Sequence, residues 1–266
     1  MKSLNSGAFG ICVAVAMLAG CGPSTNSMPL ENPGNTSASF LSRPPAPVAP
    51  SRSRYTENVL YRFRGKNGSK PYSGLIFDNK GALYGTTSEG GAYGAGTVFR
   101  LTPSASGYTE SFLYSFTGYS DGLAPQAGLI SDKEGALYGT TAFGGSNKGG
   151  TVFKLTPSGS GYTESVLHSF TGGADGDNPG AGLTFGRNGV LYGTTTAGGE
   201  KRRHEGGTVF KLTPSGSGYT ESVLHSFGHA YPYGSLILDK EGALYGTASS
   251  SARQDSSDGY VFKVTP

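Results

Sequence analysis

Four phrases recur in the same order from residue 55 onward, and this repetition limits the possible folds more than any other feature. The phrases first read YTENVLYRF, SGLIFD, ALYGTT and GTVFRLTP. The third phrase begins at Ala82, Ala136, Val190 and Ala243, so successive copies lie 53 or 54 residues apart. A fixed period of this length indicates a repeat architecture, in which each copy forms one supersecondary unit.

Each phrase has the composition of a β-strand. The copy YTESVLHSF is rich in β-branched and aromatic residues, and its alternation places one set of side chains on one side: Tyr162, Glu164, Val166, His168 and Phe170. Turn signals such as DNKG, DKEG and TPSGSG separate the phrases, and many of the 45 glycines recur at these turns. Beyond the N-terminal region no segment has helical periodicity. The sequence therefore predicts an all-β protein.

Four short strands in a period of about 50 residues are typical of a β-propeller blade. We expect four four-stranded blades over residues 55–266. A β-solenoid is the main alternative, but its coils are shorter and need no hairpin turn after each strand. The repeat starts with an outer-strand phrase, Tyr55–Phe63, and stops after a third-strand phrase. We therefore expect the N- and C-terminal strands to pair and close the ring, which would remove the exposed edges.

The repeated unit also resembles a known family. The sequence GxLYGTT, followed by Gly-Gly and by GTVFKLTP, is similar to the GloVer tandem repeat of secreted and surface-anchored bacterial proteins. The resemblance extends from Tyr55 to Pro266. It implies a propeller-like fold and a location outside the cytoplasm, but it implies no reaction.

The first 20 residues resemble a bacterial lipoprotein signal peptide. An apolar run, Ala8–Leu18, follows Lys2 and is too short to span a bilayer. The run ends in LAGC, which resembles a lipobox, so we expect Cys21 to be lipidated and to become the first mature residue. An ordinary secretory signal with an incidental cysteine is the alternative. Because Gly22 rather than an aspartate follows, we expect an anchor in the outer membrane, facing the periplasm or the surface.

Residues 21–54 have the composition of a disordered tether that carries the lipid. They contain few apolar side chains and seven prolines: Pro23, Pro29, Pro33, Pro44, Pro45, Pro47 and Pro50. Such a segment cannot bury enough apolar surface to offset the entropy lost on ordering. We therefore expect three regions, namely the signal peptide at 1–20, the tether at 21–54 and the propeller at 55–266.

The sequence contains no set of residues typical of catalysis and no cofactor motif. His168 and His225 occupy a position that is tyrosine in other copies, so we interpret them as strand-surface residues. Asp175 and Asp177 have the alternate spacing that calcium sites use, but the equivalent loops lack it, which favours a plain Asp-Gly turn. Similar blades place similar residues around the axis, whereas an acid, a base and a nucleophile must differ. We expect no enzyme activity, no metal and no cofactor.

Sequence variation is concentrated in the loops at one end of the strands. The loops after YGTT differ strongly, while the TPSGSG turns at the other end hardly change. The most divergent loop contains the candidate ligand-binding residues Lys201, Arg202, Arg203 and His204. Arginine side chains can bind carboxylate or phosphate in bidentate fashion, so an anionic ligand would fit this loop. Most of the 16 tyrosines recur in strand phrases, which favours core packing over sugar stacking.

These features predict a lipid-anchored binding or display protein of the bacterial envelope. The expected partners are the membrane, through the N-terminal lipid, and an anionic glycan or an envelope protein. The net charge of only +3 argues against a nucleic acid. The alternatives are a hydrolase or lyase that acts on polysaccharide and a purely structural surface protein.

Overall fold

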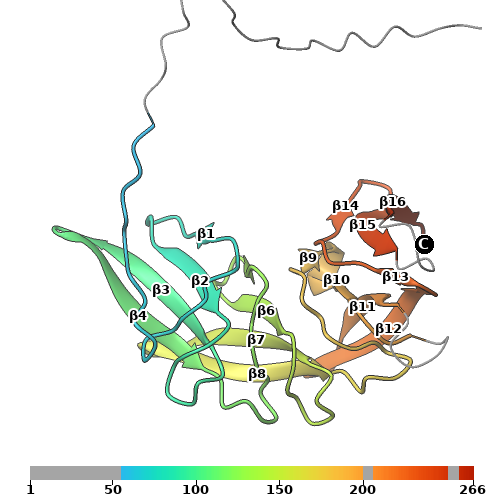
Figure 1. Cartoon of the computed structure of the whole chain (residues 1–266), viewed down its shortest axis with the longest axis horizontal. Helices are drawn as coiled ribbons and strands as arrows, with labels where there is room; N and C mark the ends of the chain where they lie inside the picture. Colours follow the sequence, from blue (N-terminus) through green and yellow to red (C-terminus); the bar gives the residue numbers. More distant parts are fainter. Residues whose placement is uncertain (1–54, 200–205, 251–257) are drawn as a thin grey trace, which may run out of the picture. The chain divides into compact units, whose positions relative to one another are not determined.

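The computed structural model describes residues 55–199, 206–250 and 258–266, and Thr56–Pro266 forms one compact unit. This unit is all-β, as predicted, and its strands form four antiparallel sheets that we call blades 1 to 4 (Figure 1). The predicted signal peptide and tether lie outside the described residues. Within the described part of the chain, no helix is long and apolar enough to cross a membrane.

The first three blades have the same four-stranded plan. Blade 1 consists of β1 (Ile76–Phe77), β2 (Leu83–Thr87), β3 (Thr97–Ser104) and β4 (Gly107–Ser115). Blade 2 consists of β5 (Ile130–Ser131), β6 (Leu137–Thr141), β7 (Thr151–Ser158) and β8 (Gly161–Ser169). Blade 3 consists of β9 (Thr184–Phe185), the short 3₁₀ turn η1 (Arg187–Gly189), β10 (Leu191–Thr195), β11 (Thr208–Ser215) and β12 (Gly218–Ser226). Each strand pairs with the next in chain order, so the four predicted phrases match the four strands.

The outer strands contain a β-bulge that changes which side chains face the core. In blade 1, Val98 pairs with Tyr114 and Phe99 pairs with Phe112, so Leu113 has no opposite residue. The extra residue reverses the alternation beyond the bulge. Leu113 and Leu167 therefore pack against the core, whereas Phe112 and Val166 are exposed. The predicted strict alternation, with Val166 on the same side as Tyr162, is wrong at this point.

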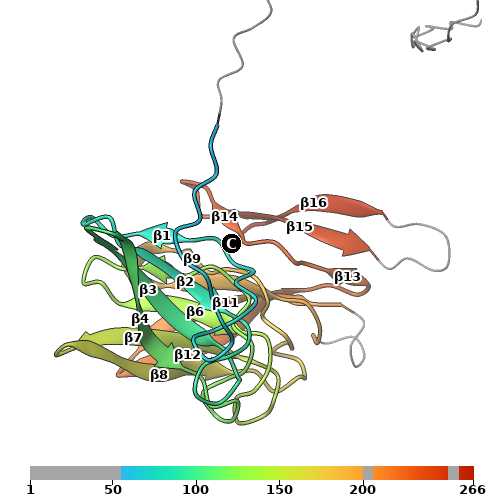
Figure 2. The same cartoon turned by 60° about the vertical axis from the view of Figure 1, so that its left-hand side comes forward.

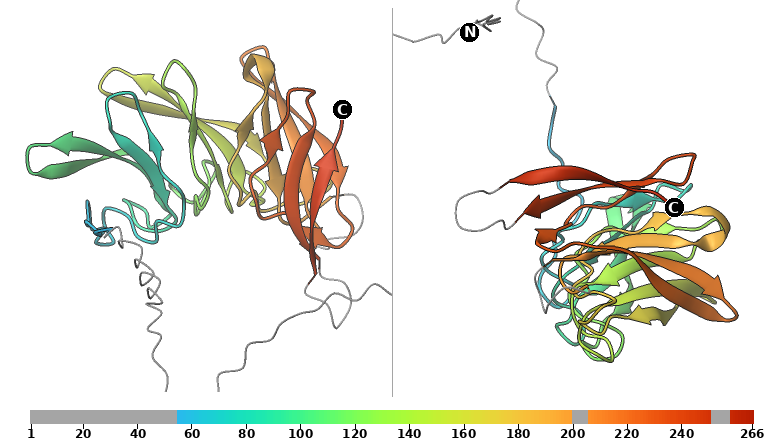
Figure 3. Two further views of the ribbon diagram at one scale, coloured as in Figure 1. Left: turned by 90° about the horizontal axis from the view of Figure 1, so that it is seen from above. Right: turned by 90° about the vertical axis from the view of Figure 1, so that its right-hand side faces the viewer.

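Phenylalanine rings join successive blades. Phe116, directly after β4, packs edge-on against Phe153 of β7, with ring centroids 5.1 Å apart, and Phe170 and Phe210 repeat the contact at 5.0 Å. The glycine of YGTT makes room for this ring, because a Cβ on Gly139 would lie 2.6 Å from Cζ of Phe153. The blades follow one another in chain order, with blades 1 and 4 at opposite ends of the series (Figure 3).

Blade 4 departs from this plan. It consists of β13 (Ala230–Tyr231), β14 (Ile237–Leu238), β15 (Leu244–Ser250) and β16 (Gly259–Val264). Both short strands pair with β15 on the side away from β16, so β16 is the outermost described strand (Figure 2). Residues 55–64 form no strand. The predicted pairing of the terminal strands is therefore not formed, because Tyr61 and Phe63 pack against blade 1 at the other end of the series.

Candidate binding face

The loops before the first strand and after the second strand of each blade lie at the same end of the strands. We call this end the variable face; its described loop residues are 64–75, 88–96, 116–129, 142–150, 170–183, 196–199, 206–207 and 227–236. Residues 200–205, which include the candidates Lys201, Arg202, Arg203 and His204, lie outside the described residues. The site must therefore be built from the other loops.

An Asp-Gly or Asn-Gly turn fixes the first loop of blades 1 to 3. The glycines of these turns have φ values of +105°, +118° and +112°, which only glycine adopts readily: Gly68, Gly122 and Gly176. Each glycine lies against a buried threonine pair, such as Thr141 and Thr151, whose hydroxyl oxygens are 2.8 Å apart. The turn and the pair together anchor the loop to the end of the sheet.

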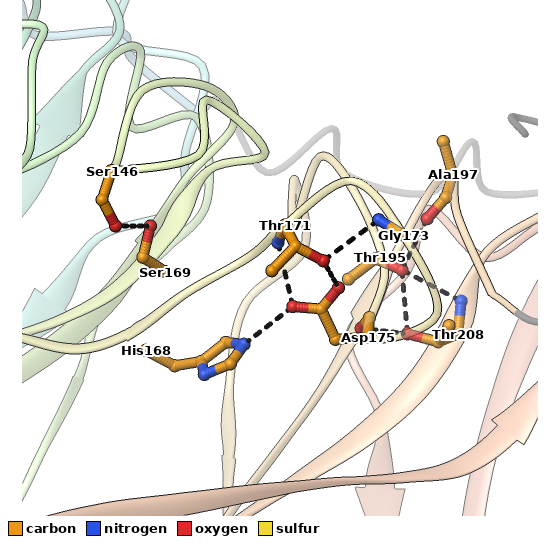
Figure 4. Close-up of polar contacts among 9 residues, drawn as sticks. All are labelled: Ser146, His168, Ser169, Thr171, Gly173, Asp175, Thr195, Ala197 and Thr208. Atoms are coloured by element: carbon orange, nitrogen blue, oxygen red, sulfur yellow. Dashed lines mark hydrogen bonds and ion pairs between the residues drawn. The ribbon is translucent and has the colours of Figure 1, made fainter.

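Asp175 belongs to one of these turns (Figure 4). Its carboxylate accepts hydrogen bonds from the main-chain N–H of Thr171 at 2.9 Å, from the Thr171 hydroxyl, and from Nε2 of His168 at 3.3 Å. Asp121 of blade 2 accepts the equivalent bonds from Thr117 and Tyr114. The carboxylate of Asp175 therefore has a structural role that recurs between blades.

Asp177, the other residue considered for calcium, pairs through its main chain with Ala197. Among the described residues, no group of three or more His, Cys, Asp or Glu side chains is arranged to bind a metal ion. The calcium interpretation gains no support from this geometry.

Main-chain hydrogen bonds connect the loops of neighbouring blades. The N–H of Ala124 donates to the carbonyl of Ala95 in the preceding blade at 3.0 Å, and Asn178 donates to Gly149 at 2.9 Å. Both donors have a left-handed conformation, with φ near +57°, and their carbonyls accept bonds from the second loop of their own blade. One residue thus links three segments, so main-chain hydrogen bonds join the described loops of blades 1 to 3 into one band.

A groove crosses this band between blades 2 and 3. It has a volume of about 510 Å³, within the range of small-molecule sites, and is lined by Asn147, Lys148, Gly149, Thr171, Gly172, Gly173 and Asp177. The lining offers one cation, one carboxylate and amide and hydroxyl groups. Such a set can form hydrogen bonds with a polyhydroxylated ligand.

Exposed aromatic side chains are the feature of the variable face that the sequence interpretation missed. Five described aromatic residues in these loops are 44–78% exposed: Tyr72, Tyr93, Tyr119, Phe143 and Tyr233. Several strand tyrosines pack in the core, as predicted, for example Tyr84 and Tyr138, whereas Tyr260 of β16 is 46% exposed. Their position in the sequence could have identified them as loop residues, because these five residues lie between the repeated phrases rather than within them.

Comparison with known proteins places the repeat in a family. The model of the Gloeobacter/Verrucomicrobia repeat matches residues 48–262. The chain belongs to the Gloeobacter/Verrucomicrobia repeat family. This assignment confirms the GloVer resemblance seen in the sequence. No curated protein matches the chain.

Solved structures with a similar fold are distant from this member of the Gloeobacter/Verrucomicrobia repeat family. A gluconolactonase from Xanthomonas campestris is 17% identical, with a TM-score of 0.44 over 73% of this chain and 62% of the gluconolactonase. A protein of unknown function from Dyadobacter fermentans is 14% identical, with a TM-score of 0.44 over 76% of this chain and 67% of its own. The chain thus spans less than two thirds of the gluconolactonase.

In this Gloeobacter/Verrucomicrobia repeat protein, glutamates of the YTE sequence lie between neighbouring outer strands. Burial, followed by the charge of Asp121, raises the pKa of Glu164 to about 7. Burial and Asp175 raise the pKa of Glu221 to about 7 in the same way. One carboxylate oxygen of each glutamate is buried without a hydrogen-bond partner. Because the two sites are copies of each other, they resemble a repeated structural contact rather than an acid–base pair.

A second hollow of this family member, of about 550 Å³, lies between blades 1 and 2 at the end opposite the variable face. Its carboxylate Asp78 accepts bonds from the N–H groups of Lys80 and Ala82 and from the Tyr84 hydroxyl. Arg100 lies over the ring of Tyr84, 5.7 Å from its centroid. Asp132 makes comparable bonds in blade 2, so these acidic groups stabilise repeated turns.

Proposed function

We propose that this protein is a lipid-anchored binding or display protein of the bacterial envelope, and that its variable face binds a glycan. The exposed aromatic residues of that face carry the proposal. Exposed aromatic rings gathered on one face of a protein are typical of a binding surface, and flat sugar faces stack on such rings. Tyr119 and Phe143 belong to neighbouring loops of blade 2, where the N–H of Gly145 donates to the carbonyl of Tyr119 at 2.7 Å.

The fixed loops support binding rather than catalysis. Main-chain bonds between blades hold the aromatic residues without an ordering cost at binding, which favours affinity. A hydrolase or lyase that acts on polysaccharide is the alternative function. The acidic groups with raised pKa values do not favour it, because Glu164 and Glu221 occupy equivalent buried positions.

The candidate residues Lys201, Arg202 and Arg203 extend this proposal toward an acidic glycan. They belong by sequence to the loop after β10, which is equivalent to the loop of blade 2 that contains Phe143. Removing their three charges would weaken the binding of an acidic glycan more at low salt than at high salt. Binding of neutral glycans, which should not change when these charges are removed, provides the comparison.

The test is a binding screen of the full chain, in detergent, against peptidoglycan fragments and neutral and acidic envelope polysaccharides. For the glycan that binds, Tyr119→Ala combined with Phe143→Ala should weaken the affinity by about tenfold or more, since about 1.4 kcal/mol of lost stacking is a factor of ten. Phe77→Ala is the matched control, because Phe77 is 67% exposed and lines the hollow at the opposite end.

Two results would contradict the proposal. One is the absence of binding to every glycan in the screen. The other is wild-type affinity of the double variant for the glycan that binds. Release of new reducing ends from a bound polysaccharide would instead support the hydrolase or lyase.

A further inference from the structure

The outer side of blade 4 exposes apolar residues that the other blades bury. The valine of TVF is fully buried in the first three blades, where it faces the next blade: Val98, Val152 and Val209. The equivalent residue in β16, Val261, is 75% exposed, and Ile237 on the same blade is 70% exposed. Blade 4 thus presents the surface that normally contacts a following blade, and no described residue covers it.

Blade 1 exposes the complementary surface. The leucine before its first strand, Leu75, is 50% exposed. The equivalent leucines of the other blades are at most 4% exposed because a preceding blade covers them: Leu129, Leu183 and Leu236. The two open surfaces are therefore the two sides of one repeated contact.

The segment Tyr55–Phe63 packs on blade 1 in the position that the outer strand of one blade occupies on the next blade. Phe63 packs edge-on against Phe99 with ring centroids 4.8 Å apart, as Phe116 packs against Phe153 at 5.1 Å. Tyr61 donates to Glu110 of blade 1 through its hydroxyl at 3.2 Å. Yet Val59 and Leu60 are about half exposed, and the segment pairs with no described strand. The segment is therefore available to pair with the third strand of another blade, the strand equivalent to β3.

We propose that blade 4 of one copy binds blade 1 of a second copy, and that Tyr55–Phe63 of the second copy pairs with β16 of the first. An exposed strand edge pairs readily with a free extended segment. The register follows from blade 1, where Val98 pairs with Tyr114 and Phe99 with Phe112. By equivalence, Val261 would pair with Tyr61 of the second copy, and Phe262 with its Val59.

The regular spacing of the blades favours a second copy over closure within one chain. The ring contacts between successive blades measure 5.1, 5.0 and 5.0 Å, so each step repeats the same geometry. Three such steps join the four blades and leave the first and last blades at opposite ends of the series (Figure 3). Two head-to-tail copies would supply eight blades, which is within the range of closed propellers.

Native mass spectrometry of the full chain in detergent tests this contact. The wild type should have twice the mass of one chain. Val261→Asp should raise the dissociation constant by about 100-fold or more, because it buries an unpaired charge in the contact. At a concentration at which the wild type and Val261→Asp are both monomeric, their melting temperatures should be equal, since Val261 is exposed in a single copy. Val166→Asp, at another exposed valine, is the control and should remain dimeric.

Photocrosslinking identifies the surface. A photoreactive phenylalanine analogue at position 237, where the isoleucine is 70% exposed on the same face as Val261, should crosslink two differently tagged copies, with the crosslink in residues 55–99. A wild-type monomer, or a crosslink to the same residues within one chain, would overturn the proposal. So would a ladder of masses beyond two copies, which would mean that the ring does not close at eight blades.

Discussion

The Asp-Gly turn of blade 2 shows how a single backbone conformation fixes a loop to the sheet. Gly122 has φ of +118°, and the main-chain N–H groups beside it pair with neighbouring segments. The neighbouring Asp121 accepts three hydrogen bonds from Thr117 and Tyr114. A sequence that places Asp or Asn before glycine in three copies predicts the turn. It does not predict the buried threonine pair on which the turn rests.

We predict that Gly122→Ala lowers the free energy of unfolding by about 2–4 kcal/mol, through an unfavourable φ and a steric clash. A Cβ at this position would lie 2.3 Å from Oγ1 of Thr141. Gly218→Ala is the control, because a Cβ there meets nothing within 4 Å, and its effect should stay within about 0.5 kcal/mol. Urea denaturation measures both. Equal effects of the two variants would contradict the assigned role of the turn.

The strands and turns of each blade were the most predictable part of the fold. The phrases predicted the four strands of each repeat because alternation and turn residues are local signals. The β-bulge was not predictable, since the extra residue at Leu113 depends on the register with the neighbouring strand. Nor was the burial of the YTE glutamates, which depends on the contact between two blades rather than on one strand.

These glutamates make the stability of the protein depend on pH. The pKa of Glu164 is about 7 in the folded protein, above its ordinary value of 4.5. Between these two values the folded state keeps a proton that the unfolded state has lost. The stabilisation that the folded state gains by binding this proton more tightly is therefore complete below pH 4.5, and it is lost as the pH rises toward 7.

We predict that the free energy of unfolding of the wild type falls relative to Glu164→Gln by roughly 1–3 kcal/mol between pH 4.5 and 7.5. The glutamine cannot titrate, so it removes the dependence at this site. Glu134→Gln, at an exposed turn position, is the control and should keep the wild-type profile. Parallel profiles for the wild type and Glu164→Gln would show that this glutamate does not carry the effect.

The arrangement of the blades and the binding residues was only partly predictable from the sequence. The repeat number gave four blades, but the pairing of terminal strands was wrong, because a period does not specify the angle between successive blades. The exposed aromatic loop residues were missed because most tyrosines lie in strand phrases, where they pack in the core. The basic candidates Lys201 to His204 and the lipidation site Cys21 lie outside the described residues, so they stay predictions.

Membrane anchoring through Cys21 is testable in the whole protein. We predict that Cys21→Ala abolishes labelling with radioactive palmitate and releases the protein from membranes, because the thiol that forms the thioether is lost. Cys12→Ala is the control, since Cys12 lies within the predicted signal peptide and should not affect either result. A Cys21→Ala protein that is still processed and membrane-bound would show that the motif is incidental.

The main-chain bonds between neighbouring loops have a consequence for how this protein can change in evolution. The N–H of Ala124 and the carbonyl of Ala95 hold their loops together without any particular side chain. Most substitutions in these loops therefore leave the scaffold intact, apart from those at the turn glycines. New recognition properties can accumulate by point mutation at little risk to folding, and they can arise in one repeat while the others keep the older ones. The backbone of this protein thus tolerates changes in loop sequence, and this tolerance allows its binding properties to evolve.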